Sequence, residues 1–157
     1  MLIDCGFSEG LIASLEKLGK RVKAVFLTHS HYDHICGLNE LLVHSPVVKI
    51  YTNIEGEKAL YDAKLNISKY HSEIQPFVYA GQGNVELLED SIIWELFRGE
   101  DLRVMFTPGH DVSCISYVIS KTVFTGDSYL PWYKDCYELP EKQPCISIEE
   151  HCYAHGT

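Results

Sequence analysis

The first half of the chain alternates short apolar runs with segments in which apolar residues recur every three or four positions. Such runs are typical of buried strands, and the recurring pattern is typical of helices that cover a sheet. The predicted strands are residues 2–5, 22–27 and 47–52. The predicted helices are residues 11–18, 37–44 and 55–66.

The pattern changes in the second half, where short β segments follow one another without intervening helices. They are residues 85–88, 92–97, 102–107, 114–119 and 122–125. Helices interleaved with strands, followed by a run of short strands, predict a mixed α/β sandwich. We expect one domain over residues 1–157, because 157 residues with 46% hydrophobic content are enough for one core but too few for two.

A cluster of potential metal ligands directly follows the second predicted strand. Residues 29–34, His-Ser-His-Tyr-Asp-His, hold three histidines and one aspartate. Packing does not explain this cluster, because polar groups need partners when they are buried. Imidazole and carboxylate groups are ligands for zinc, iron and manganese. The sequence therefore predicts a metal site mounted on the end of a strand.

Two later strands each end in a turn that presents one further potential ligand. His110 follows Pro108 and Gly109 after the strand at 102–107, and Asp127 follows Gly126 after the strand at 122–125. Taken alone, His110 is explained equally well as a ligand or a loop residue, whereas an aspartate in the position of Asp127 is more often a turn-former than a ligand. Their placement after strands, like that of the first cluster, favours a shared role as ligands.

Composition narrows the possible partners. The formal net charge is −9 and the isoelectric point is near 5.3, so the chain lacks the basic surface that binding to a phosphate backbone requires. We expect a small-molecule substrate and no nucleic-acid partner. No apolar stretch is long enough to span a bilayer, and the N-terminus has no signal-peptide pattern. These features predict a cytoplasmic protein without a membrane partner, and its six cysteines are expected to be reduced.

Four motifs in this order resemble the metallo-β-lactamase superfamily, and most closely its glyoxalase II-like (hydroxyacylglutathione hydrolase-like) branch. They are Ile-Asp-Cys-Gly at 3–6, Thr-His-Ser-His-Tyr-Asp-His at 28–34, Thr-Pro-Gly-His at 107–110 and Thr-Gly-Asp-Ser at 125–128. The resemblance implies a four-layer αββα sandwich, in which two β-sheets pack face to face with helices outside. It also implies a dinuclear metal site at one edge of the sandwich.

The resemblance further implies a role for each potential ligand. The first metal ion would be held by His29, His31 and His110. The second would be held by Asp33 and His34. We expect two divalent ions, zinc in the first place, with iron or manganese as alternatives.

The resemblance also implies roles for residues outside the ligand sets of the two ions. Asp127 would bridge the two ions, and Asp4 would support the ligand loops from behind without binding metal. For the last ligand, a histidine near the C-terminus, His155 is the best match and His151 is its rival. The chain starts inside the family's first motif strand, which predicts either a truncated form or another copy of the chain covering an exposed sheet edge.

The predicted function is a metal-dependent hydrolase. Two metal ions about 3.5–4 Å apart lower the pKa of a shared water and supply hydroxide for attack on a carbonyl carbon. Asp33 is the catalytic candidate, because it would both bind metal and orient this nucleophile. We expect a small carbonyl substrate such as a thioester or lactone. The alternatives are an iron-dependent oxidoreductase of the sulfur dioxygenase-like type, and a truncated metal-binding domain without activity.

Overall fold

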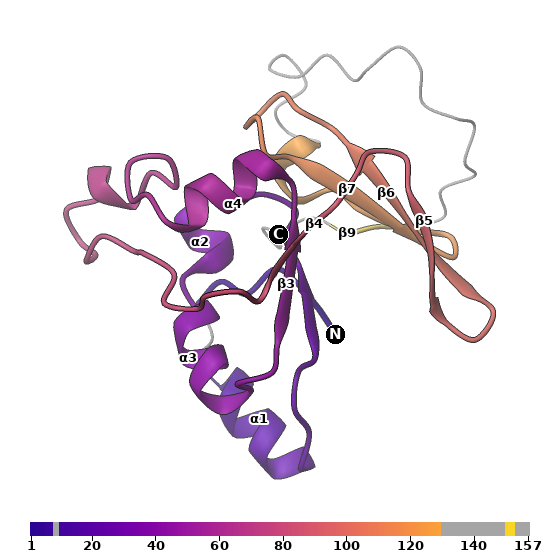
Figure 1. The fold of residues 1–157 in the computed structure, drawn as a ribbon, viewed down its shortest axis with the longest axis horizontal. Helices are drawn as coiled ribbons and strands as arrows, with labels where there is room; N and C mark the ends of the chain where they lie inside the picture. The colour runs from indigo at the N-terminus through magenta and orange to yellow at the C-terminus, as the bar shows by residue number, and fades with distance from the viewer. Residues whose placement is uncertain (8–9, 130–149, 153–157) are drawn as a thin grey trace.

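The computed structural model describes residues 1–7, 10–129 and 150–152, and these form two β-sheets (Figure 1). All neighbours in the first sheet, called here the parallel sheet, run parallel. Its strands in order are β1 (Leu2–Ile3), β2 (Ala24–Phe26), β3 (Lys49–Thr52) and β4 (Val85–Leu87). The second, called the mixed sheet, is antiparallel except where β9 joins β8. Its strands in order are β5 (Ile93–Phe97), β6 (Glu100–Phe106), β7 (Ile115–Ile119), β8 (Thr122–Phe124) and β9 (Glu150–Cys152).

Helices connect the parallel strands. They are α1 (Leu11–Leu18) after β1, α2 (Tyr32–Ile35) and α3 (Leu38–His44) after β2, and α4 (Ile54–Leu60) after β3. Crossovers between parallel neighbours share one hand, so successive crossovers in one direction place their helices on the same face of the sheet. Figure 1 shows these helices on one side of the parallel sheet and the mixed sheet on the other. This arrangement confirms the predicted sandwich.

Strand β2 contributes to both hydrophobic cores of the molecule. Val25 belongs to the core between the parallel sheet and the helices, whereas Phe26 belongs to the core between the two sheets. The Phe26 ring stacks on Tyr51 with centroids 4.6 Å apart and meets Tyr117 edge to face at 5.6 Å. Complete burial of such side chains contributes about 1.5–3 kcal/mol each. Burial on both faces explains why this strand is part of an unbroken apolar run in the sequence.

Two hydrogen bonds join the sheets directly below the predicted ligand loop. The Tyr117 hydroxyl donates to the Leu27 carbonyl over 2.6 Å, and the Ile115 amide donates to the Thr28 carbonyl over 2.7 Å. Both carbonyls lie just beyond the end of β2. The mixed sheet therefore fixes the point at which the ligand loop leaves the parallel sheet.

The predicted helix at 55–66 is shorter than expected, because α4 ends at Leu60. The buried Asn66 side chain donates to the carbonyls of Ala59, at 2.9 Å, and Phe77, at 3.0 Å. The Tyr79 amide donates to the Leu60 carbonyl. The last carbonyls of α4 thus accept hydrogen bonds from donors outside the helix, where a longer helix would supply the amides of its next turn. The spacing of apolar residues does not reveal such donors.

Replacing Asn66 with alanine is expected to lower the free energy of unfolding by about 2–4 kcal/mol. The variant removes the partner of the Phe77 carbonyl and of the Ser68 amide, whereas the Ala59 carbonyl keeps the Asp62 amide as a donor, and each unsatisfied buried group costs about 1–3 kcal/mol. Denaturant unfolding measures the loss. Asn39→Ala is the matched control, because the more exposed Asn39 side chain also donates to a carbonyl, that of Val78. Equal losses in the two variants would contradict this role for Asn66.

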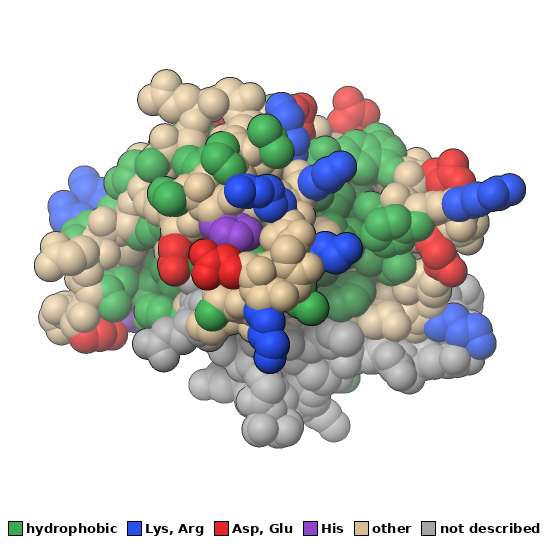
Figure 2. Space-filling view, turned by 90° about the horizontal axis from the view of Figure 1, so that it is seen from below, with side chains coloured by type: hydrophobic (Ala, Val, Ile, Leu, Met, Phe, Trp, Pro, Cys, Tyr) green, Lys and Arg blue, Asp and Glu red, His purple; other side chains and the backbone are tan. Residues whose placement is uncertain are grey.

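Charges of both signs share the surface. On the face in Figure 2, Lys and Arg side chains lie next to acidic and hydrophobic ones. Two ion pairs on the surface of the molecule join side chains of opposite charge: Lys49 with Glu86 at 2.7 Å, and Lys58 with Glu55 at 2.8 Å. Within the described residues, no helix combines the length and apolar composition needed to cross a membrane.

Candidate metal centre

The predicted ligands come from loops that leave both sheets at the same end of the sandwich. The first cluster follows β2, and carboxyl ends of parallel strands share one edge of a sheet. His110 follows β6 and Asp127 follows β8 in the mixed sheet. The hydrogen bonds from Ile115 and Tyr117 bring these loops together across the sandwich.

The structure brings five predicted ligands into two overlapping groups. One group contains His29, His31 and His110, and the other contains His29, His34 and Asp127. Within each group the potential ligand atoms all lie within 4.8 Å of one another. His31 Nδ1 is 2.9 Å from His110 Nε2, so these two nitrogens face each other. Nitrogen and oxygen atoms from distant parts of the chain thus converge on two adjoining positions.

Asp127 lies between the two groups. Its Oδ1 is 3.6 Å from His34 Nε2, and its Oδ2 is 3.7 Å from His110 Nε2. The Asp127 side chain is buried. One carboxylate oxygen is directed to each group, which is the placement that a bridging ligand requires.

The other predicted ligands are placed less tightly or lie outside the described residues. Asp33 Oδ2 is 3.8 Å from His34 Nε2, beside the second group, in which His29 occupies the third place. His155 lies outside the described residues, and for His151, within β9, only the backbone is described.

Asp4 supports the histidines from behind through three hydrogen bonds. Its Oδ1 accepts from the Thr28 amide and its Oδ2 accepts from the Thr28 hydroxyl, both over 2.7 Å. Its Oδ2 also lies 2.9 Å from His34 Nδ1. The Thr28 hydroxyl is 3.3 Å from His29 Nδ1, so that His29 is linked to Asp4 through one residue. These contacts direct the Nε2 atoms of both histidines toward the ligand groups.

Glycines allow the ligand loops to approach one another closely. A Cβ atom on Gly6 would lie 2.1 Å from the Asp33 carbonyl oxygen, and one on Gly126 would lie 2.2 Å from Thr28 Oγ1. Gly126 also has a φ of +50°, in the left-handed region. The glycines of the first and last motifs therefore keep the ligand loops in contact.

The histidines of the second group differ in their affinity for protons. Burial, together with the neighbouring His34 and His31, lowers the pKa of His29 to about 2, so its ring is neutral at pH 7. Burial also acts to lower the pKa of His34, but hydrogen bonds to Asp127 and Asp4 outweigh it and raise that pKa to about 10. A metal ion that binds His34 Nε2 must therefore displace a proton.

The residues present fit a bound transition metal. His29 is fully buried, and its Nε2 has no hydrogen-bond partner among the described residues. A buried polar atom without a partner is costly, and a metal ion at this position would remove the cost. Imidazole and carboxylate groups are ligands that zinc, iron and manganese all accept. The position of the His29 Nε2 atom and the chemistry of the neighbouring ligands therefore both fit a bound transition-metal ion.

Sequence reasoning missed Asp111, which lies at the edge of the first group. Its Oδ2 is 3.6 Å from His31 Nε2, and its Oδ1 accepts hydrogen bonds from the Ser113 amide and hydroxyl. Burial acts to raise the pKa of Asp111, but its contacts with His31 and Ser113 outweigh this and hold the pKa below its usual range. The only signal in the sequence is an acidic residue directly after a predicted ligand.

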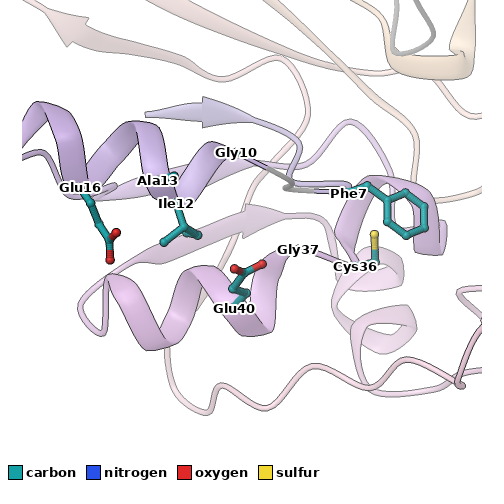
Figure 3. Close-up of a pocket in the computed structure, with 8 residues that line it drawn as sticks. All are labelled: Phe7, Gly10, Ile12, Ala13, Glu16, Cys36, Gly37 and Glu40. Carbon is teal, nitrogen blue, oxygen red and sulfur yellow. The ribbon is translucent and has the colours of Figure 1, made fainter.

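A separate pocket of about 490 Å³ lies beside α1 and α3, and none of the clustered histidines lines it. Figure 3 shows the Glu16 and Glu40 side chains at this pocket, with the Cys36 thiol at one end. Burial raises the pKa of Cys36, so its thiol is protonated at neutral pH. The lining residues are Phe7, Gly10, Ile12, Ala13, Glu16, Cys36, Gly37 and Glu40.

Comparison with known proteins shows the family to which this chain is similar. A family model described as the metallo-beta-lactamase superfamily matches residues 1–137. The chain is 29% identical over 128 residues to the hydroxyacylglutathione hydrolase of Buchnera aphidicola subsp. Schizaphis graminum, and 30% identical over 128 residues to that of Photobacterium profundum. The alignments cover 82% of this chain but 42% and 41% of the relatives. The chain thus spans about two fifths of the length of these curated relatives.

Solved structures share the same fold. The crystal structure of BLEG-1, a B3 metallo-β-lactamase, has a TM-score of 0.70 at 25% identity and covers 82% of this chain and 61% of its own. An archaeal metallo-β-lactamase superfamily protein from Sulfolobus tokodaii has a TM-score of 0.65 at 28% identity, covering 83% of this chain and 55% of its own.

Proposed function

Because this chain belongs to the metallo-β-lactamase superfamily, we propose that it is a metal-dependent hydrolase that cleaves a thioester or lactone of a small substrate. The observation that carries the proposal is the convergence of five potential ligands in two adjoining groups, with one Asp127 oxygen directed to each group. A carboxylate placed between two sets of ligands suits two metal ions better than one. Zinc is the proposed metal at both positions.

The relatives support the choice of bond. The curated proteins that the chain matches at 29% and 30% identity are named hydroxyacylglutathione hydrolases, and an acyl group on the thiol of glutathione is a thioester. The B3 metallo-β-lactamase supports the same fold and a metal-dependent hydrolase in general. We therefore favour a thioester or lactone over a β-lactam.

Each residue has a defined task in the proposed reaction. Two divalent ions supply a water activated for attack at neutral pH and polarise the substrate carbonyl. His29, His31 and His110 would hold the first ion. Asp33 and His34, whose Oδ2 and Nε2 atoms lie 3.8 Å apart, would hold the second, and Asp33 would also orient the nucleophile toward the carbonyl carbon.

Two carboxylates complete the proposed arrangement. Asp127 would join the two positions, because it is buried and its two oxygens face His34 and His110. Asp4 keeps His29 and His34 directed at the site through its hydrogen bonds with Thr28 and His34. Such supporting contacts tune both metal affinity and ligand orientation.

Hydrolysis assays on the zinc-loaded chain test the proposal. We expect turnover of an acyl-glutathione thioester or a small lactone, loss of turnover on chelation, and recovery on addition of zinc. His31→Ala is expected to abolish this turnover while the far-ultraviolet circular dichroism spectrum stays unchanged, because His31 lies in a loop at the edge of the sandwich. Unchanged turnover in this variant, or activity only as iron-dependent oxygen consumption, would contradict the proposal.

A further inference from the structure

The Asp4 contacts reach the rings of His29 and His34 but not that of His31. His31 Nδ1 faces His110 Nε2 at 2.9 Å, inside the first group. Its Nε2 points away from this group, to Asp111 Oδ2 at 3.6 Å. A neutral imidazole carries its proton on one nitrogen only, so what lies opposite Nε2 decides whether Nδ1 is free to bind metal.

Asp111 is held rigidly in its place. Its Oδ1 accepts a hydrogen bond of 2.8 Å from the Ser113 amide and another from the Ser113 hydroxyl. The same hydroxyl accepts from the Ser30 amide, in the residue just before His31. Ser113 is buried, and its carbonyl accepts from the Asn53 side chain. Ser113 therefore ties the Asp111 carboxylate to the backbone that carries His31.

The other half of the site has the same arrangement with the ring nitrogens exchanged. Asp4 Oδ2 is 2.9 Å from His34 Nδ1, and His34 Nε2 is directed to Asp127. At His31 the carboxylate faces Nε2 and Nδ1 is directed to the site. A carboxylate behind a ligating histidine fixes its tautomer and its ring orientation.

We propose that Asp111 is the positioning residue of the first ligand group: it holds His31 with the proton on Nε2 and leaves Nδ1 available to the metal. The inference rests on the proposed function, because it assigns a task toward the same metal centre. The 3.6 Å distance between Asp111 Oδ2 and His31 Nε2 is longer than a hydrogen bond, but it places the carboxylate opposite this nitrogen.

Asp111→Asn separates this task from a purely structural one. The asparagine keeps an oxygen that accepts from Ser113, but it places an NH₂ group opposite His31 Nε2. An NH₂ group donates, so it favours a bare Nε2 and a proton on Nδ1, where metal must bind. Asp101→Asn is the matched control, because it makes the same chemical change at an exposed position of β6, away from the ligand groups.

Nuclear magnetic resonance of the imidazole nitrogens in the metal-free chain gives the first readout. We expect neutral His31 to carry its proton on Nε2 in the natural chain and in Asp101→Asn, and on Nδ1 in Asp111→Asn. The same tautomer in all three proteins would overturn the proposal. This readout needs no metal and no activity, so it stays decisive even if the proposed hydrolysis fails.

Zinc titration against a competing chelator gives the second readout. In Asp111→Asn, the zinc affinity reported by the His31 and His110 ring signals is expected to fall about 10- to 100-fold. The affinity reported by the His34 ring signal is expected to stay within about twofold, since Asp4 supports His34. An equal loss at both groups, or an equal loss in Asp101→Asn, would show a nonspecific effect and overturn the proposal.

Discussion

Replacing Asp127 with asparagine is expected to lower kcat/KM by a factor of about 10³ or more. Metal ions contribute several kcal/mol of transition-state stabilisation, and each 1.4 kcal/mol corresponds to about tenfold in rate. Asp127 is the one described side chain whose two oxygens face both ligand groups, at 3.6 Å from His34 and 3.7 Å from His110. The amide removes the negative charge that both positions share. Steady-state kinetics on the zinc-loaded variant measures the loss.

The matched control for this experiment is Asp101→Asn. Asp101 is exposed in β6, away from the ligand groups, and undergoes the same chemical change. Its turnover and zinc content are expected to equal those of the natural chain. If Asp127→Asn retained full turnover, the bridging role would be wrong. If both variants lost turnover together, the loss would reflect charge or folding and not the metal centre.

Replacing Gly126 with alanine is expected to lower the free energy of unfolding by about 2–5 kcal/mol. The new Cβ would lie 2.2 Å from Thr28 Oγ1, and relieving such a contact costs about 1–3 kcal/mol. The φ of +50° adds about 1–2 kcal/mol for a residue with a side chain. Because Thr28 donates to Asp4, we also expect zinc affinity to fall. Denaturant unfolding of the metal-free chain measures the first effect.

Gly99→Ala separates the two costs. Gly99 has a φ of +83°, but nothing lies within 4 Å of the position that its Cβ would occupy. We therefore expect a loss of only about 1–2 kcal/mol, from the left-handed conformation alone. A loss as large as that of Gly126→Ala would mean that the contact with Thr28 is relaxed at no cost, and that this approach does not constrain the site.

Much of the fold follows from local patterns. The strands near residues 24 and 50 lie within apolar runs, and α1 has helical spacing that ends at Gly19. The end of α4 does not follow from such patterns, because the Asn66 side chain and the Tyr79 amide take the last carbonyls from outside the helix. Contacts between residues distant in sequence thus decide where this helix ends.

The candidate site also has residues that local sequence patterns predict and residues that they do not. The sequence predicts the residues that follow strands, since His29, His31 and Asp127 each come directly after an apolar run. It does not predict Asp111, because the role of this side chain depends on which nitrogen of His31 faces it across the sandwich. The sequence likewise does not predict that His29 belongs to both groups, because this depends on where the rings lie. The His29 ring centroid is 3.9 Å from that of His34 and 5.0 Å from that of His110.

Metal content per folded chain, measured by elemental analysis after purification without chelators, is the most direct test of the dinuclear centre. Because five potential ligands form two adjoining groups and Asp127 faces both, we expect about two zinc ions per chain, removed by chelation and restored by added zinc. Near-zero metal that added zinc, iron or manganese does not restore would contradict the central claim.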